Sequence, residues 1–275
     1  MGSRAAAKRV YVSELLRALV LGIVQGLTEF LPVSSSGHLE LAKVILAREE
    51  VAEEGLLMTV VLHFGTALAT MWVFRRDIAS ILGGIFGGER EDLLFAGKIA
   101  ASMVPAAVVG LLFERELESL FTGQVLLIGL MLAITGLLLL LADRARETQR
   151  GVTWRDSVVI GLSQAIAIMP GISRSGATIS TSVLLGVDRT KAARFSFLMV
   201  VPLIFGAIAK DLLDGDAYAE LDQWPAYLAG FAASFFTGVL ACTWMISIVR
   251  QSKLRYFAYY CFAVAALAVG VTYFG

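Results

Sequence analysis

Two apolar segments of the chain are interrupted by the same polar pattern. The first copy holds Gly22, Gln25, Ser34, Ser36 and Gly37. At a constant offset of 139 residues, their counterparts are Gly161, Gln164, Ser173, Ser175 and Gly176. Because the offset is about half of the 275 residues, the sequence indicates a duplicated unit within one transmembrane domain, residues 1–275. We place repeat one at about residues 10–143 and repeat two at about residues 155–275.

The composition makes these interruptions informative. Hydrophobic residues form 57% of the chain and charged residues 17%, with a mean hydropathy of +0.76, whereas soluble proteins are about 25% charged. The chain is therefore predicted to be a polytopic membrane protein. In lipid, broken backbone persists only where it is buried in protein or lines a wet cavity, so the binding site is expected at the two breaks. The formal net charge of zero gives no reason to expect a nucleic-acid partner.

The predicted fold is all-α. Six segments are long enough, or nearly so, to cross a bilayer: residues 56–74, 93–113, 124–142, 192–209, 224–249 and 254–274. Four shorter segments form two pairs, 11–31 with 36–47 and 157–169 with 175–185, and each pair is interpreted as a re-entrant helical hairpin. Since each unit is then a hairpin plus three spans, and three is odd, the two repeats are predicted to be inverted.

The distribution of charge agrees with this topology. Loops expected on one side of the membrane carry 13 basic residues, and those on the other side carry three. The positive-inside rule makes the basic side cytoplasmic. No cleavable signal peptide is evident, and Cys242 and Cys261 are interpreted as packing residues.

The polar residues at the breaks are the candidate site. Gln25 and Glu29 are four residues apart, so a helix places them on one face, and a carboxylate at membrane depth indicates a functional site. Residues 34–37, Ser-Ser-Ser-Gly, would begin a helix whose free N–H groups bind an anion. A plain N-cap is an equally good reading of these serines.

The second break carries Arg174, whose guanidinium offers bidentate donors that match phosphate. An ion pair with Glu29 is the structural alternative. Other donors surround it and, together with Gln25, Ser34, Ser36 and Gly37, complete a predicted anion site: Ser173, Ser175, Gly176 and Thr178.

The chain has two histidines. His38 follows the serine turn and is predicted to act as an acid, base or nucleophile. His63 has no polar neighbour in sequence and is expected to be structural. Ser35, or Ser34 beside it, is a candidate nucleophile, with Glu29 or His38 as the proton acceptor and an activated water as the rival.

The stretches QGLTEFLPVSSSGH (residues 25–38) and PGISRSGAT (residues 170–178) resemble the two signature motifs of the undecaprenyl-diphosphate phosphatases, the bacitracin-resistance family. The resemblance covers nearly the whole chain. It implies a hydrolase that converts undecaprenyl diphosphate to undecaprenyl phosphate and phosphate and so recycles the lipid carrier of cell-wall synthesis. It also implies the bacterial inner membrane, with the site toward the outer face.

The same resemblance implies a divalent cation, Mg²⁺ or Ca²⁺. The family often has Glu where this chain has Gln25, and a neutral amide binds a cation more weakly, so the metal role shifts to Glu29. The catalytic set is thus predicted to be Glu29, Ser35, His38 and Arg174.

Two other functions are consistent with the sequence. Inverted repeats with broken helices are typical of transporters, so a transporter or flippase for a lipid-linked phosphate is one alternative. A phosphatase for another prenyl diphosphate is the second. The density of phosphoryl-transfer groups favours the enzyme. The sequence leaves open whether the protein is a monomer or a homodimer.

Overall fold

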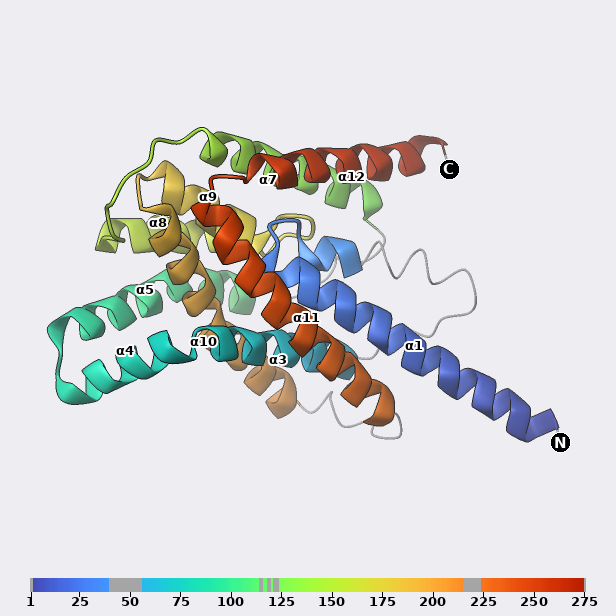
Figure 1. Cartoon of the computed structure of the whole chain (residues 1–275). Helices are drawn as coiled ribbons and strands as arrows, with labels where there is room; N and C mark the ends of the chain where they lie inside the picture. Colours follow the sequence, from blue (N-terminus) through green and yellow to red (C-terminus); the bar gives the residue numbers. More distant parts are fainter. Residues whose placement is uncertain are drawn as a thin grey trace.

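The computed structural model describes residues 2–39, 56–113, 116–117, 120, 124–214 and 224–274. This part of the chain is helical, with no strand (Figure 1). The residues of the first predicted repeat hold α1 (Gly2–Phe30), α3 (Leu56–Val73), α4 (Arg75–Gly87), α5 (Arg90–Leu112) and α7 (Val125–Asp143). Those of the second hold α8 (Trp154–Ile166), α9 (Arg174–Leu184), α10 (Arg189–Asp214), α11 (Trp224–Arg250) and α12 (Arg255–Phe274).

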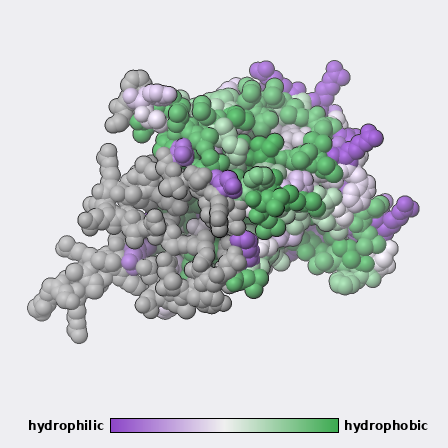
Figure 2. Space-filling model, turned by 180° about the vertical axis from the view of Figure 1, so that it is seen from behind, coloured by the Kyte–Doolittle hydropathy of each residue, from purple (hydrophilic) through white to green (hydrophobic). Residues whose placement is uncertain are grey.

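The long apolar helices agree with the predicted spans. Five of the described helices are long and apolar enough to cross a bilayer by themselves: α5, α7, α10, α11 and α12. The sixth predicted span, α3, meets the same test together with α4, from which it is bent by 74°. Hydrophobic residues predominate on the described part of the face in Figure 2, and hydrophilic ones gather along one edge. The chain is therefore a multi-pass membrane protein in composition and architecture.

The helix α4 was not anticipated from the sequence, which placed Arg75 and Arg76 in a loop. It begins directly after Phe74 and ends at Gly88, which adopts φ +76°. Its apolar residues are spaced for one face of a helix, and Ile81 on that face is buried. α4 is too short to span a bilayer. It points in a different direction from α3, and a short turn connects it to α5 (Figure 1).

The first helix of each repeat packs closely on a later helix of the other repeat. α1 lies along α11, and α8 lies along α5. Glycine permits both contacts, since a Cβ added to Gly22 would overlap the carbonyl of Gly230, and one added to Gly161 would overlap that of Ser102. Gly22 and Gly161 are themselves counterparts at the offset of 139.

Helices α8 and α9 form a hairpin. The hydroxyl of Thr148, before α8, donates to the carbonyl of Gly186, after α9, over 2.7 Å. Arg150 contacts the carbonyl of Leu185 and also pairs with Asp156 at 2.8 Å. The two ends of the pair therefore lie together, which is the shape expected of a hairpin over residues 157–169 and 175–185. In the first repeat, the predicted second arm, residues 36–47, lies outside the described residues beyond residue 39.

Asp156 fixes the start of that hairpin. Its side chain and that of Thr153 form a reciprocal capping box at the first turn of α8. Burial alone would raise the pKa of the Asp156 carboxyl, but hydrogen bonds from Thr153 and Arg150 outweigh it and hold that pKa below its usual range. The carboxylate is thus ionised in the folded protein at neutral pH.

Several loops predicted to lie on the basic side meet at one end of the molecule. Arg189 donates to the carbonyls of Asp143 and Ala145, and the amide of Arg255 donates to the Asp143 carboxylate. Arg194 pairs with Asp77 of α4 at 2.6 Å. The ends of α7, α4, α10 and α12 are therefore joined at one face, as the charge distribution requires.

Candidate active site

The first break ends α1 at Phe30 and restarts a helix at Ser35. Ser34 adopts φ +70°, a left-handed conformation that costs about 1–2 kcal/mol for a residue with a Cβ. Its hydroxyl accepts the amide of Gly37 at 3.2 Å. Ser34 is therefore an N-cap for the helical turn that carries Ser35 and Ser36. This corresponds to the second of the two interpretations that the sequence allowed for this serine.

The second break is built in the same way. Ser173 caps α9, and its hydroxyl accepts the amide of Gly176 at 3.1 Å. Gly171 has φ +93°, and a Cβ there would press on the backbone of Ile128 in α7. Only glycine fits such a turn. The chain thus places Arg174 at the first position of α9, where the preceding turn sets its direction.

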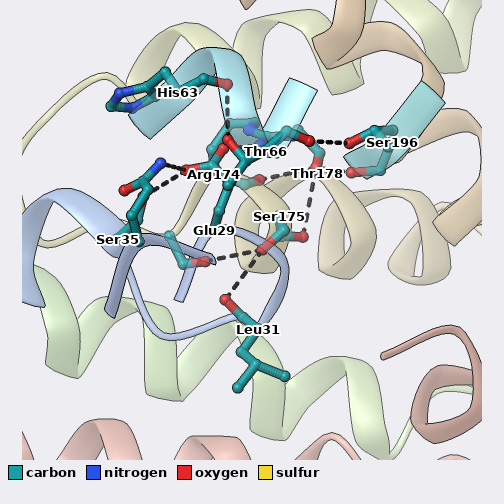
Figure 3. Close-up of polar contacts among 12 residues, drawn as sticks. Glu29, Leu31, Ser35, His63, Thr66, Arg174, Ser175, Thr178 and Ser196 are labelled. Carbon is teal, nitrogen blue, oxygen red and sulfur yellow. Dashed lines mark hydrogen bonds and ion pairs between the residues drawn. The ribbon is translucent and has the colours of Figure 1, made fainter. Parts of the chain in front are cut away.

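Glu29 and Arg174 join the two breaks across 145 residues. The Arg174 guanidinium donates through Nη2 to Oε1 of Glu29. The other carboxylate oxygen of Glu29 accepts Ser35 Oγ at 2.8 Å and Gln25 Nε2 at 3.1 Å. Figure 3 shows Ser35 and Arg174 on either side of Glu29. This buried carboxylate therefore holds the serine hydroxyl and the guanidinium in one cluster.

A cavity of about 170 Å³ opens beside this cluster. Polar groups from both repeats line it: Thr28, Glu29, Ser35, Ser36, His63, Ser173 and Arg174. Nη1 of Arg174 is buried and has no hydrogen-bond partner among the described residues. Because a buried donor without a partner is expensive, an anion in this cavity would satisfy it.

Several other residues predicted to bind the substrate do not line the cavity. Ser175 contacts the carbonyl of Leu31 at 3.4 Å, and Thr178 bonds to the carbonyl of Arg174 at 2.8 Å and to Ser196. Neither they nor Gly37 and Gly176 line the cavity. These residues hold the two breaks in place, and Gln25 acts on Glu29 from one turn away.

Of the two histidines, His63 lies at the cavity and His38 lies away from it. His63 lines the cavity. Its Nδ1 donates to the carbonyl of Thr59 at 2.9 Å, which leaves Nε2 as the basic nitrogen when the ring is neutral. His38 does not line the cavity: its Nδ1 bonds to the carbonyl of Ser34 at 2.8 Å, and its Nε2 bonds to Tyr260 at 2.7 Å. No pattern in the sequence distinguished His63, because the other residues that line the cavity come from distant segments.

The donor set for a divalent cation is small. No group of three or more His, Cys, Asp or Glu side chains suited to a metal occurs among the described residues. Oε1 of Gln25 is buried without a partner there, and it belongs to the side chain that bonds to Glu29. Glu29 is the carboxylate that lines the cavity, and one carboxylate fits Mg²⁺, which usually takes one or two protein carboxylates and completes its shell with phosphate and water.

The family model described as "Bacitracin resistance protein BacA" matches residues 18–267. The chain belongs to the BacA family. Among curated relatives, a protein of Christiangramia forsetii named undecaprenyl-diphosphatase is 59% identical over 261 residues, 94% of this chain and 99% of the relative. Proteins with the same name from Bacteroides fragilis and Methanococcus vannielii are 41% and 38% identical. They cover 94% and 91% of this chain, and 98% of each relative is matched.

Family membership confirms the resemblance found at the two breaks. The match includes both Ser/Gly motifs and all helices from the second half of α1 to most of α12. BacA relatives from bacteria and from an archaeon share nearly the full length of this chain, so the whole bundle, rather than one segment, is the family's unit.

Proposed function

We propose that this chain hydrolyses undecaprenyl diphosphate to undecaprenyl phosphate and phosphate, which recycles the carrier lipid of cell-wall synthesis. One observation carries the proposal: Ser35, Glu29 and Arg174 meet at a buried cavity with a free guanidinium nitrogen. The names of the BacA relatives support the substrate.

The geometry favours Ser35 as the nucleophile. Its Oγ already donates to Glu29, so the carboxylate can take the hydroxyl proton as Oγ attacks the terminal phosphorus. The P–O bond to the lipid phosphate then breaks, and the monophosphate leaves. Water next hydrolyses the phosphoserine, releasing phosphate and restoring Ser35.

Arg174 would stabilise the transferring phosphoryl group. Protonation of Glu29 removes the charge that holds the guanidinium, so Nη2 is released as negative charge gathers on the phosphoryl oxygens. Nη1 has no competing partner among the described residues. Both nitrogens can then bind the transition state, where such donors contribute most.

The histidines receive separate roles. Because Nδ1 of His63 is bonded to its own helix, Nε2 is the nitrogen available to accept a proton from the attacking water in the second step. His38 is a positioning residue, since it ties the carbonyl of Ser34 to Tyr260 of α12. The serine turn, including its strained Ser34, is thereby held in register.

A divalent cation would be held by Glu29, which lines the cavity, with phosphate oxygens and water as the remaining ligands. When bound, it would neutralise charge on the diphosphate. The metal's identity, Mg²⁺ or Ca²⁺, is open to direct titration.

We further propose that the two repeats are inverted, that the basic face is cytoplasmic, and that the site opens to the outer face of the inner membrane. The reciprocal packing of α1 on α11 and of α8 on α5 supports the duplication. The hairpin of α8 and α9 supports a re-entrant entry of Arg174.

The deciding experiment measures phosphate release from undecaprenyl diphosphate by purified protein in detergent, with and without EDTA, beside Arg174→Lys. We expect release that depends on Arg174 and falls when EDTA is added. Lipid binding without release, in folded protein, would contradict the hydrolase and favour a transporter.

A further inference from the structure

A second cavity, larger than the first, lies between α1, α11 and α12. Its volume is about 570 Å³, within the range of small-molecule pockets. Aliphatic and aromatic side chains make up most of its wall, among them Leu27, Leu31, Ile248, Trp244, Tyr256 and Phe257. We call it the α11–α12 groove. The first cavity, beside Glu29 and Arg174, is called the phosphoryl cavity from here on. Nothing in the chemistry proposed for the phosphoryl cavity uses the α11–α12 groove.

The groove adjoins the phosphoryl cavity. Thr28 lines both of them, and Glu29 follows it directly in α1. A second connection is Tyr260, which lines the groove and bonds to His38 at 2.7 Å with the two rings stacked 5.6 Å apart. A molecule with its phosphate beside Arg174 and its remainder in the groove would therefore pass Thr28.

The groove is also open at the side. Trp244 and Tyr256 in its wall are more than half exposed, at 56% and 58%. In a bilayer such side chains face lipid, so a long apolar chain can enter sideways without crossing water. Apart from Thr28 and the hydroxyls of the two tyrosines, the polar groups of the wall are Ser247, Gln251 and Lys253, near the junction of α11 and α12.

We propose that the α11–α12 groove binds the first isoprene units of the substrate's prenyl tail. This inference rests on the proposed function. The occupant follows from adjacency: a prenyl diphosphate joins one anionic end to one apolar chain, and here an anion cavity and an apolar groove meet at Thr28. The volume admits only part of a long tail, so the rest stays in the bilayer.

The groove acts through contact with the tail rather than through the hydrophobic effect. Lipid tails are as apolar as the groove, so burial of the prenyl chain there gains little from the hydrophobic effect. Van der Waals contact and shape instead hold the tail, and because the tail takes no part in the reaction, this binding is equal in the ground state and the transition state. Blocking the groove is therefore expected to raise KM with a small change in kcat.

The kinetic test fills the groove with indole. Ser247→Trp in α11 and Leu27→Trp in α1 each place a large side chain in the groove. If one variant does not fold, the other is sufficient for the test. We expect KM for undecaprenyl diphosphate to rise about tenfold. A rise in KM with kcat nearly unchanged is the result expected when binding that is equal in the ground state and the transition state is lost. Val271→Trp is the matched control, because Val271 is 63% exposed on α12 and lies outside the groove. An unchanged KM in both filled variants would overturn the proposal.

The second test does not depend on turnover. A farnesyl diphosphate analogue with a photoreactive group on its terminal isoprene is crosslinked to the full chain, and the labelled peptides are mapped. We expect label on groove residues of α11 and α12, displaced by undecaprenyl diphosphate, lost in Ser247→Trp and retained in Val271→Trp. Label on other helices would refute the groove as the tail site.

Two further outcomes separate the hypotheses. A photoreactive phospholipid that labels the groove and resists displacement by undecaprenyl diphosphate would show a bulk-lipid site and overturn the proposal. Displaceable labelling in a protein that releases no phosphate would support the groove while contradicting the hydrolase.

Discussion

The guanidinium of Arg174 pairs with the carboxylate of Glu29, and the same carboxylate accepts the hydroxyl of Ser35. Glu29 and Arg174 are 8% and 16% exposed in their side chains. One buried anion thus neutralises the cation of the second repeat and orients the candidate nucleophile of the first. The site exists only where both breaks meet.

Arg174→Lys is expected to lower turnover by about 100-fold or more, because it keeps the charge but loses the planar fork aimed at phosphate. Arg174→Ala should in addition destabilise the protein by about 3–5 kcal/mol, since it leaves Glu29 buried and unpaired. Phosphate release and thermal unfolding in detergent measure the two effects. Near-normal turnover in Arg174→Lys would remove the guanidinium from the mechanism.

Ser35→Ala is expected to lower turnover by about 1,000-fold or more, as for loss of a nucleophile. Ser36→Ala is the matched control in the same cavity and should retain most activity, because the hydrogen bond of the Ser36 hydroxyl in the described structure is a long one, to Ser34 at 3.4 Å, and does not involve Glu29. Acid quenching should trap phosphate on the peptide that contains Ser35. Substantial turnover by Ser35→Ala without phosphoprotein would instead indicate direct attack by water.

The histidines should differ in the step that they affect. His63→Gln is expected to lower kcat by about 100-fold and to accumulate phosphate on Ser35, because the second step loses its base. His38→Gln should lower activity less and should not accumulate this intermediate, since His38 only holds the serine turn. The reverse pattern would return the proton-transfer role to His38.

Asp156→Asn is expected to reduce thermal stability by about 1 kcal/mol through loss of the capping box. Because the pKa of the Asp156 carboxyl is held below its usual range, its contribution is complete above the unfolded pKa and is lost as the pH falls through the folded pKa. The difference in Tm between wild type and Asp156→Asn should therefore shrink in strongly acidic buffer. An equal difference at all pH values would argue against the linkage.

Single cysteines at Glu116 and Arg146 should react with a membrane-impermeant maleimide from opposite sides of the membrane. Cys242 and Cys261 are fully buried, so the unmodified chain should give little background. Labelling of both positions from one side would contradict the inverted repeats.

Much of the architecture could be predicted from local sequence. Apolar length fixed the spans, because a bilayer core requires about 20 residues per crossing. Pro, Gly and Ser marked the breaks, and the offset between Ser34 and Ser173 predicts a duplication. α4 was missed, since its Arg75 and Arg76 read as a loop and no length rule demands a helix there.

The sequence by itself determined which residues stand at the breaks: Glu29, Ser35 and Arg174 are set by turn chemistry and by the expense of charge in lipid. Only the tertiary structure decided which of them touch. Contacts across 145 residues paired Arg174 with Glu29. The packing of α3 brought His63 to the cavity, and the packing of α12 drew His38 toward Tyr260. Such partners depend on helix packing between distant segments, a property that no local pattern encodes.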